Sequence, residues 1–107
     1  MTWLFLVIAI CLEVSGTTSM KLSQGFSKTL FTVVTFLCYG LSFTFLSLTL
    51  RHLEIGVAYA IWSGLGTALI AVIGFLWFKE SVTVVKIISM ALIIIGVIGL
   101  NLSKAAP

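Results

Sequence analysis

Residues 7–21 read "VIAICLEVSGTTSMK" and place one acid, Glu13, inside an otherwise apolar run. The first lysine, Lys21, follows eight residues later. An α-helix rises about 1.5 Å per residue, so roughly 20 apolar residues cross a bilayer core of about 30 Å. Glu13 then lies about 15 Å from either surface of the membrane. This stretch therefore predicts a membrane helix with a carboxyl group at the depth where a charge is most costly.

The whole chain has the composition of a membrane protein. Of its 107 residues, 61% are hydrophobic and only 8% are charged, and the mean hydropathy is +1.29. A soluble domain carries about 25% charged residues, so a soluble protein is excluded. Four apolar runs, at about 3–20, 30–50, 57–78 and 84–102, are each long enough to span a bilayer. We predict a single all-α integral membrane domain over residues 1–107, with four transmembrane helices.

Short polar segments join the four runs, so consecutive helices are expected to be antiparallel neighbours. An excess of lysine and arginine marks the cytoplasmic ends of membrane spans. Four lysines flank the first and third connections, on one side of the membrane, and two basic residues lie on the other side. The four are Lys21, Lys28, Lys79 and Lys86, and the two are Arg51 and Lys104. This bias weakly favours termini outside the cell, and insertion in both orientations remains open.

Glu13 is the one charged residue that cannot reach a membrane surface by extending its side chain. Burying an acid at the centre of a span costs about 2.5–3.5 kcal/mol on insertion scales. The spans contain no buried lysine or arginine to neutralise it. The carboxyl must therefore be protonated much of the time or meet a cation from outside, as a proton-coupling site does. The alternative is a protonated acid that joins helices by a hydrogen bond, but intramembrane acids more often mark a transport pathway.

Small and hydroxyl-bearing residues share the helix face of Glu13. Ala9 and Gly16 leave room for another backbone, and Thr17 lies one turn on, where its hydroxyl can donate to the carboxylate. The net charge of +3 comes from basic residues at span ends and suits lipid headgroups rather than nucleic acid. Two cysteines inside apolar runs supply no metal site, so no cofactor is expected.

Aromatic residues of the second and third spans complete the predicted site. Tyr59, Trp62 and Ser63 share a face of the third span, and Tyr39 and Phe43 lie one turn apart in the second. Ring faces attract a desolvated cation by about 2 kcal/mol, so rings around one carboxylate suit a lipophilic organic cation. The alternative is that tryptophan and tyrosine only mark the membrane interface, which fits residues at span ends better than Trp62.

The fourth span carries small residues instead of polar ones. Ser89, Gly96 and Ser103 are spaced by seven, with Gly99 beside them. A stripe of small residues lets helices approach closely in lipid. Packing within the chain explains the stripe equally well. We favour a dimer contact, because three helices already suffice to surround Glu13.

Four stretches together resemble the small multidrug resistance family of proton-coupled exporters. They are "LEVSGTTSMKLSQGF" at 12–26, "CYGLSF" at 38–43, "GVAYAIWSGLG" at 56–66 and "ALIIIGV" at 91–97. The resemblance covers nearly the whole chain in order. The guanidinium-exporting branch typically has a tryptophan shortly after the glutamate, where this chain has Ser15 and Gly16. The chain is therefore similar to the quaternary ammonium branch.

The resemblance implies an antiparallel homodimer of four-helix subunits in the bacterial cytoplasmic (inner) membrane. The first three helices would line the site and the fourth would hold the dimer. Glu13 would be the acid shared by protons and substrate, and Trp62 the essential tryptophan of the third helix. Further lining positions are Tyr59, Tyr39, Phe43, Thr17, Ser63, Ala9 and Gly16, with Trp3 as an aromatic near the entrance and Gly64 and Gly66 as a hinge. Two departures from the family pattern are Phe31 in place of a proline and Ser89 in place of a glycine.

From these residues we expect a proton-coupled antiporter that exports lipophilic and quaternary ammonium cations, with protons and substrate competing for Glu13. One alternative within transport is an exporter of guanidinium or polyamines. Another is one subunit of a heterodimeric pair. A non-transport alternative is an accessory membrane subunit. An enzyme is disfavoured, because no set of nucleophile, base and oxyanion donors can be assembled, and His52 lies in a polar loop.

Overall fold

A computed structural model describes residues 2–103 of the chain. Among these residues, all regular structure is helical. The helices are α1 (Thr2–Leu22), α2 (Thr29–Thr49), α3 (Ile55–Leu76) and α4 (Val84–Ser103). Each of the four is long and apolar enough to cross a membrane, which confirms the prediction of an all-α membrane protein.

The first connection shows how one span ends and the next begins. The Ser23 amide donates to the Ser19 carbonyl at 2.8 Å, and its hydroxyl donates to the Met20 carbonyl at 2.6 Å. These bonds satisfy carbonyls that the end of α1 would otherwise leave free. The chain then reverses through three residues with positive φ, Gln24, Gly25 and Phe26. The reversal sets α2 antiparallel to α1.

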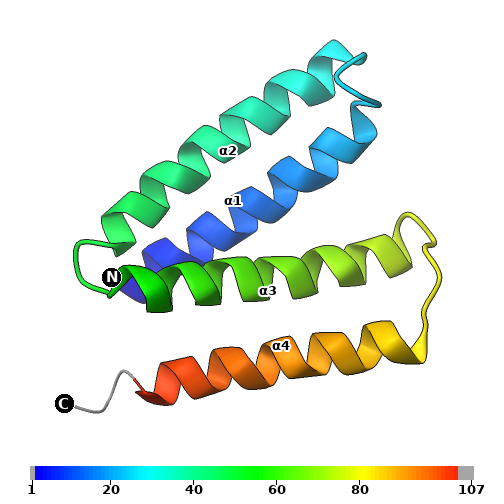
Figure 1. Ribbon diagram of the computed structural model, residues 1–107. Helices are drawn as coiled ribbons and strands as arrows, with labels where there is room; N and C mark the ends of the chain where they lie inside the picture. Colours follow the sequence, from blue (N-terminus) through cyan, green and yellow to red (C-terminus); the bar gives the residue numbers. More distant parts are fainter. Residues whose placement is uncertain (1, 104–107) are drawn as a thin grey trace.

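The helices form a flat row rather than a closed bundle. α1 packs against α2 on one side and α3 on the other, and α4 packs against α3 (Figure 1). The principal extents are 49 × 35 × 17 Å. The core therefore lies around α1, and none of the described α4 side chains is buried. The members of this core are Leu6, Ala9, Ile10, Val14, Leu46, Val57, Ile61 and Trp62.

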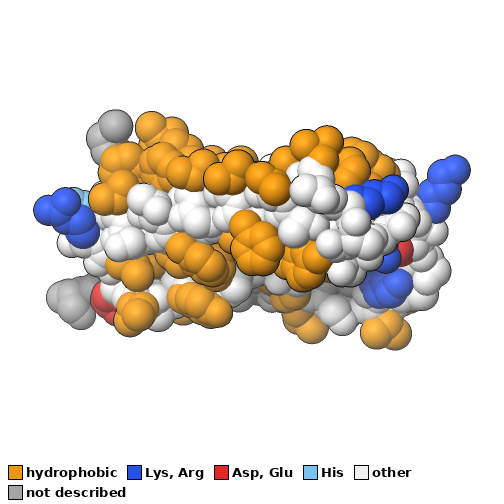
Figure 2. Space-filling model, turned by 90° about the horizontal axis from the view of Figure 1, so that it is seen from above, with side chains coloured by type: hydrophobic (Ala, Val, Ile, Leu, Met, Phe, Trp, Pro, Cys, Tyr) orange, Lys and Arg blue, Asp and Glu red, His pale blue; other side chains and the backbone are white. Residues whose placement is uncertain are grey.

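The charges lie where a membrane protein requires them. In Figure 2, lysine, arginine and acidic side chains lie toward the two ends of the molecule, and hydrophobic side chains cover the middle of the face in view. The first and third connections share one end, and the connection between α2 and α3 lies at the other (Figure 1). Large hydrophobic side chains such as Leu30 and Leu76 face outward, as side chains that face lipid do in a membrane protein.

Candidate functional site

Glu13 lies near the middle of α1, and its carboxylate contacts α3 at Gly66. A Cβ atom built on Gly66 would stand 2.7 Å from Glu13 Oε2, so a larger residue at position 66 would force the carboxylate to shift. Gly66 is buried and Glu13 is partly buried. The glycine expected to act as a hinge thus also lets the α3 backbone approach the acid. Gly66 shares a face of α3 with Trp62, four residues earlier, which is the sequence signal for this contact.

A chain of hydrogen bonds runs from α2 to Glu13. The Thr17 hydroxyl donates to Glu13 Oε1 at 3.1 Å, and the hydroxyl oxygens of Thr17 and Tyr39 are 2.5 Å apart. A hydroxyl has one proton to donate. While Glu13 is ionised, Thr17 gives its proton to the carboxylate, and Tyr39 then donates to Thr17. The tyrosine therefore positions the threonine, and the threonine holds one oxygen of the acid.

Gly16 makes room for Tyr39. A Cβ at Gly16 would stand 2.6 Å from Cδ1 and 2.7 Å from Cε1 of the Tyr39 ring. Nearby, the fully buried Ser42 hydroxyl donates to the Ala9 carbonyl at 2.6 Å and ties α2 to α1. Sequence reasoning did not single out Ser42. Its signal was weak, because serines in membrane helices also bond to their own backbone.

Four aromatic rings continue from Tyr39 across to α3. The ring centroids of Tyr39 and Phe43 are 6.4 Å apart, those of Phe43 and Trp62 5.9 Å, and those of Trp62 and Tyr59 5.4 Å. Trp62 is buried, whereas Phe43 and Tyr59 are more than half exposed. The rings thus lead from the interior of the described chain to its surface.

Two buried polar atoms in this cluster lack a hydrogen-bond partner within the described part of the chain. They are Glu13 Oε2 and Trp62 Nε1. Buried polar groups in proteins are nearly always satisfied. The carboxylate oxygen and the indole N–H are therefore two buried polar atoms whose hydrogen-bonding capacity the described residues leave unused.

Two other predicted site residues, Ser63 and Gly64, lie beside α4. The Ser63 hydroxyl donates to the Tyr59 carbonyl at 2.8 Å, and Ser63 lines a groove between α3 and α4. A Cβ at Gly64 would stand 2.8 Å from Val97 Cγ2, so this glycine sets the packing of α4 on α3. α3 runs without a break through both proposed hinge glycines. Trp3 lies in the first turn of α1 and is 40% exposed.

Three small residues of α4 lie on the surface of the described chain. Ser89 and Gly96 border grooves beside α3, and Ser89, Gly96 and Gly99 are exposed. A Cβ built on Gly96 or Gly99 would have no neighbour within 4 Å. The small size of these residues is therefore not used for packing within the subunit. Ser103, the last member of the predicted stripe, ends α4.

The fold and this cluster define a small four-helix membrane protein with an intramembrane acid that is hydrogen-bonded, through Thr17, to the first of four aromatic rings. A family model described as "Small Multidrug Resistance protein" matches residues 1–93. The chain belongs to the Small Multidrug Resistance family, and the resemblance drawn from its motifs is confirmed.

Several curated relatives match nearly the full chain. The "Uncharacterized membrane protein YvaE" of Bacillus subtilis (strain 168) is 54% identical over 95% of this chain and 86% of its own. The "Quaternary ammonium compound-resistance protein QacE" of Escherichia coli is 47% identical, covering 97% of this chain and 96% of its own. The "Quaternary ammonium compound-resistance protein QacC" of Staphylococcus aureus is 42% identical over 95% of both chains.

Proposed function

We propose that this protein is a proton-coupled antiporter that exports lipophilic and quaternary ammonium cations. The observation that carries the proposal is the unsatisfied Glu13 Oε2, which is buried beside Gly66, on an acid that Thr17 links to Tyr39 and so to a run of aromatic rings. Relatives whose names refer to quaternary ammonium compound resistance and multidrug resistance support the same substrate class. Membership of the family supports export rather than enzymatic activity.

Competition for one carboxylate provides the coupling. A quaternary ammonium ion has no N–H donor, so it is held by charge neutralisation and by ring faces rather than by hydrogen bonds. Glu13 supplies the charge, and Trp62, Tyr59, Phe43 and Tyr39 supply the rings. A proton on Glu13 removes the charge and releases the cation. The Thr17 hydroxyl keeps one oxygen in place, so that Oε2 remains the atom for which proton and cation compete.

Alternating access requires two arrangements of the site, and an antiparallel homodimer offers them. Two inverted copies of one chain correspond to the inverted repeats of larger transporters. They would bring two Glu13 carboxyls into one chamber and expose it to each side in turn. The exposed small residues of α4 support a contact between copies there, and bending of α3 at Gly64 and Gly66 would exchange the two conformations. Ser63 and Trp3, which lie apart from Glu13 in one subunit, would join the chamber or its entrance.

An exporter of guanidinium is the second candidate. A planar guanidinium group prefers paired acceptors in one plane. Glu13 offers one free oxygen, because Thr17 occupies the other, and the surroundings are aromatic. This environment favours bulkier cations. A heterodimer and a silent accessory subunit are the remaining alternatives.

The test is transport current from purified protein in proteoliposomes. Tetrapropylammonium and, separately, guanidinium are applied to the wild type, to Glu13→Gln and to the matched control Glu54→Gln, whose acid is exposed in a connection. We expect currents with tetrapropylammonium that disappear in Glu13→Gln and persist in Glu54→Gln. Currents with guanidinium alone would assign the protein to the other substrate class. Folded wild type that is silent with both cations would contradict transport by this chain alone.

A further inference from the structure

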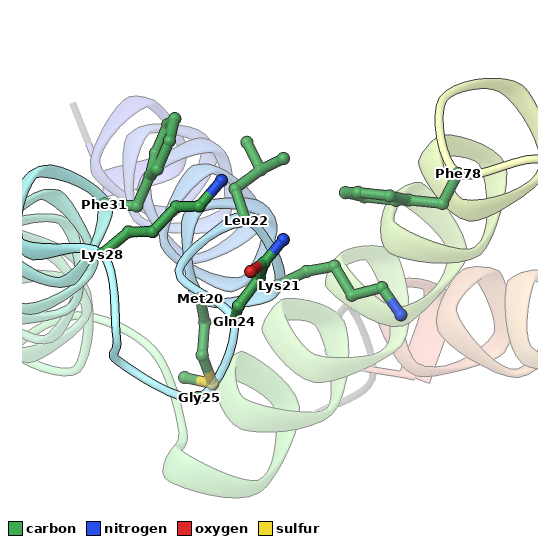
Figure 3. Close-up of a pocket in the computed structure, with 8 residues that line it drawn as sticks. All are labelled: Met20, Lys21, Leu22, Gln24, Gly25, Lys28, Phe31 and Phe78. Carbon is green, nitrogen blue, oxygen red and sulfur yellow. The ribbon is translucent and has the colours of Figure 1, made fainter.

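A large pocket opens at the end of the molecule where α1 leads into α2, well away from Glu13 along α1. It has a volume of about 560 Å³. Its lining is basic, amide-bearing and apolar, and no acidic residue belongs to it (Figure 3). The residues that matter here are Lys21, Lys28, Gln24, Leu22, Phe31 and Phe78.

The two lysines approach the pocket from different sides. In Figure 3 the Lys28 side chain reaches across the opening toward Leu22 and Phe31, with the Gln24 amide nearby. Lys21 extends toward Phe78, and its Nζ lies 5.6 Å from the centroid of that ring. Lys21 also borders a smaller pocket that Glu80 lines. Of these two lysines, Lys28 therefore lines the large pocket and no other described pocket.

The helix ends add to the positive potential. Lys28 is the N-cap residue of α2 and makes no side-chain capping bond, and the Thr32 amide bonds to the Lys28 carbonyl at the start of α2. The amides of 29–31 therefore precede the first helical bond and carry the partial positive charge of a helix N-terminus. The C-terminal end of α1 carries the opposite partial charge, but there the Ser23 amide and hydroxyl already donate to the Ser19 and Met20 carbonyls. The pocket thus combines two ammonium groups with the favourable end of a long helix.

The apolar walls of the pocket and its position at the membrane surface favour the anionic headgroup of a lipid over a free inorganic anion. The pocket lies at the ends of three membrane spans, where lipid headgroups meet the hydrocarbon core. Leu22, Phe31 and Phe78 offer apolar surface beside the charges, whereas a free inorganic anion would gain nothing from it. Basic pockets between membrane helices are known to hold anionic headgroups.

We propose that this pocket binds the headgroup of an anionic glycerophospholipid such as phosphatidylglycerol. The phosphate lies against Lys28 and Gln24, with Lys21 as a second positive charge. The glycerol and the first carbons of the acyl chains lie along Leu22 and Phe31. Because these residues are separate from the Glu13 cluster, the site does not depend on the transport mechanism.

The experiment measures binding to the purified full chain in micelles of an uncharged detergent. Dihexanoyl phosphatidylglycerol, dihexanoyl phosphatidylcholine and inorganic phosphate are titrated separately, and the amide signals of Gln24 and Gly25 are followed by NMR. The variants are Lys28→Gln, Lys28→Arg and Lys79→Gln. Lys79 is a matched control, since it is an exposed lysine at the same end of the molecule that does not line the pocket.

We expect saturable binding of phosphatidylglycerol, with a Kd raised about fivefold in Lys28→Gln. The Kd should stay near the wild-type value in Lys28→Arg and in Lys79→Gln, and phosphatidylcholine should bind more weakly. An equal loss in Lys28→Gln and Lys79→Gln would overturn the proposal, because it would show diffuse attraction to the surface. Inorganic phosphate binding as tightly as phosphatidylglycerol would also overturn it, as the apolar walls would then contribute nothing.

Discussion

Glycine and threonine at single positions shape the surroundings of Glu13. Helical spacing predicts the bond from Thr17 to Glu13, because residues four apart lie on one face, and the structure contains that bond. The role of Gly66 beside Oε2 depends on how α3 packs against α1. A sequence pattern identifies such a glycine only as a place where bending or close approach is permitted.

Gly16→Ala tests the space that Tyr39 needs. The added methyl would stand 2.6 Å from the tyrosine ring, so the ring must move, which disturbs its bond to Thr17. We expect the free energy of unfolding in detergent micelles to fall by about 1–3 kcal/mol, as for other overpacked interiors. Gly40→Ala is the control, because a Cβ there has no neighbour within 4 Å. Equal stability of the two variants would contradict the close approach.

Thr17→Val tests the donor to the carboxylate. The substitution keeps the shape of the side chain but removes the hydroxyl that holds Glu13 Oε1. A hydrogen bond to a charged group contributes about 1.5–3 kcal/mol, so we expect tetrapropylammonium to bind at least about tenfold more weakly by calorimetry. Thr18→Val serves as the control, since that hydroxyl bonds to the Val14 carbonyl of its own helix. A similar change in both variants would show that Thr17 has no special part.

At the scale of the elements, α1 and α2 are joined by a polar contact as well as by packing. Ser42 is 1% exposed, and its hydroxyl reaches the Ala9 carbonyl on the neighbouring helix. Other hydroxyls of α2 bond to their own helix instead, as those of Thr35, Thr44 and Thr49 do. Composition cannot separate the two cases, because both need only a hydroxyl and a carbonyl. Helix packing decides which carbonyl is within reach.

Ser42→Ala should loosen the hairpin of α1 and α2. Interhelical hydrogen bonds in membranes contribute about 0.6 kcal/mol on average and up to about 1.7. A short buried bond belongs in the upper part of that range, so we expect the free energy of unfolding to fall by about 1 kcal/mol. The measurement is denaturant unfolding in mixed micelles, with Thr44→Ala as the exposed control. A loss in Thr44→Ala as large as in Ser42→Ala would argue against the interhelical bond.

At the scale of the whole molecule, α4 stands apart. It lies at one edge of the row in Figure 1, and none of its described side chains is buried. The exposed faces of the other helices can contact lipid, but small residues offer lipid little contact area. Small residues instead let a second helix approach, which favours a contact between copies of the chain.

Gly96→Leu and Gly99→Leu test that contact. Because a Cβ at either position has no neighbour within 4 Å in the subunit, we expect helix content and subunit stability to be unchanged. The dimer fraction, measured by cross-linking in liposomes, should fall several-fold as the bulkier side chains hold the partner helix away. Gly40→Leu, at an exposed glycine of α2 with equal free space, should leave dimers intact. Dimers that persist in both α4 variants would exclude this surface as the contact.

The sequence by itself determined the four membrane helices, because span length and apolar content are properties of continuous stretches. Their ends lie within one or two residues of the predicted ones. It also pointed to Glu13 and Thr17, since a lone acid in an apolar run and a spacing of four are local features. Motifs along nearly the whole chain were enough to predict the family.

Only the tertiary structure decided which helix faces meet. It set α1 between α2 and α3, brought Gly66 against the carboxylate and Gly16 against Tyr39, and turned Ser63 and Gly64 toward the groove beside α4. Hydropathy could not reveal these contacts, because all sides of a membrane helix are apolar and the usual contrast between a buried and a wet face is missing. In a membrane the choice of face depends on close packing and a few polar bonds, which exist only once the helices are assembled.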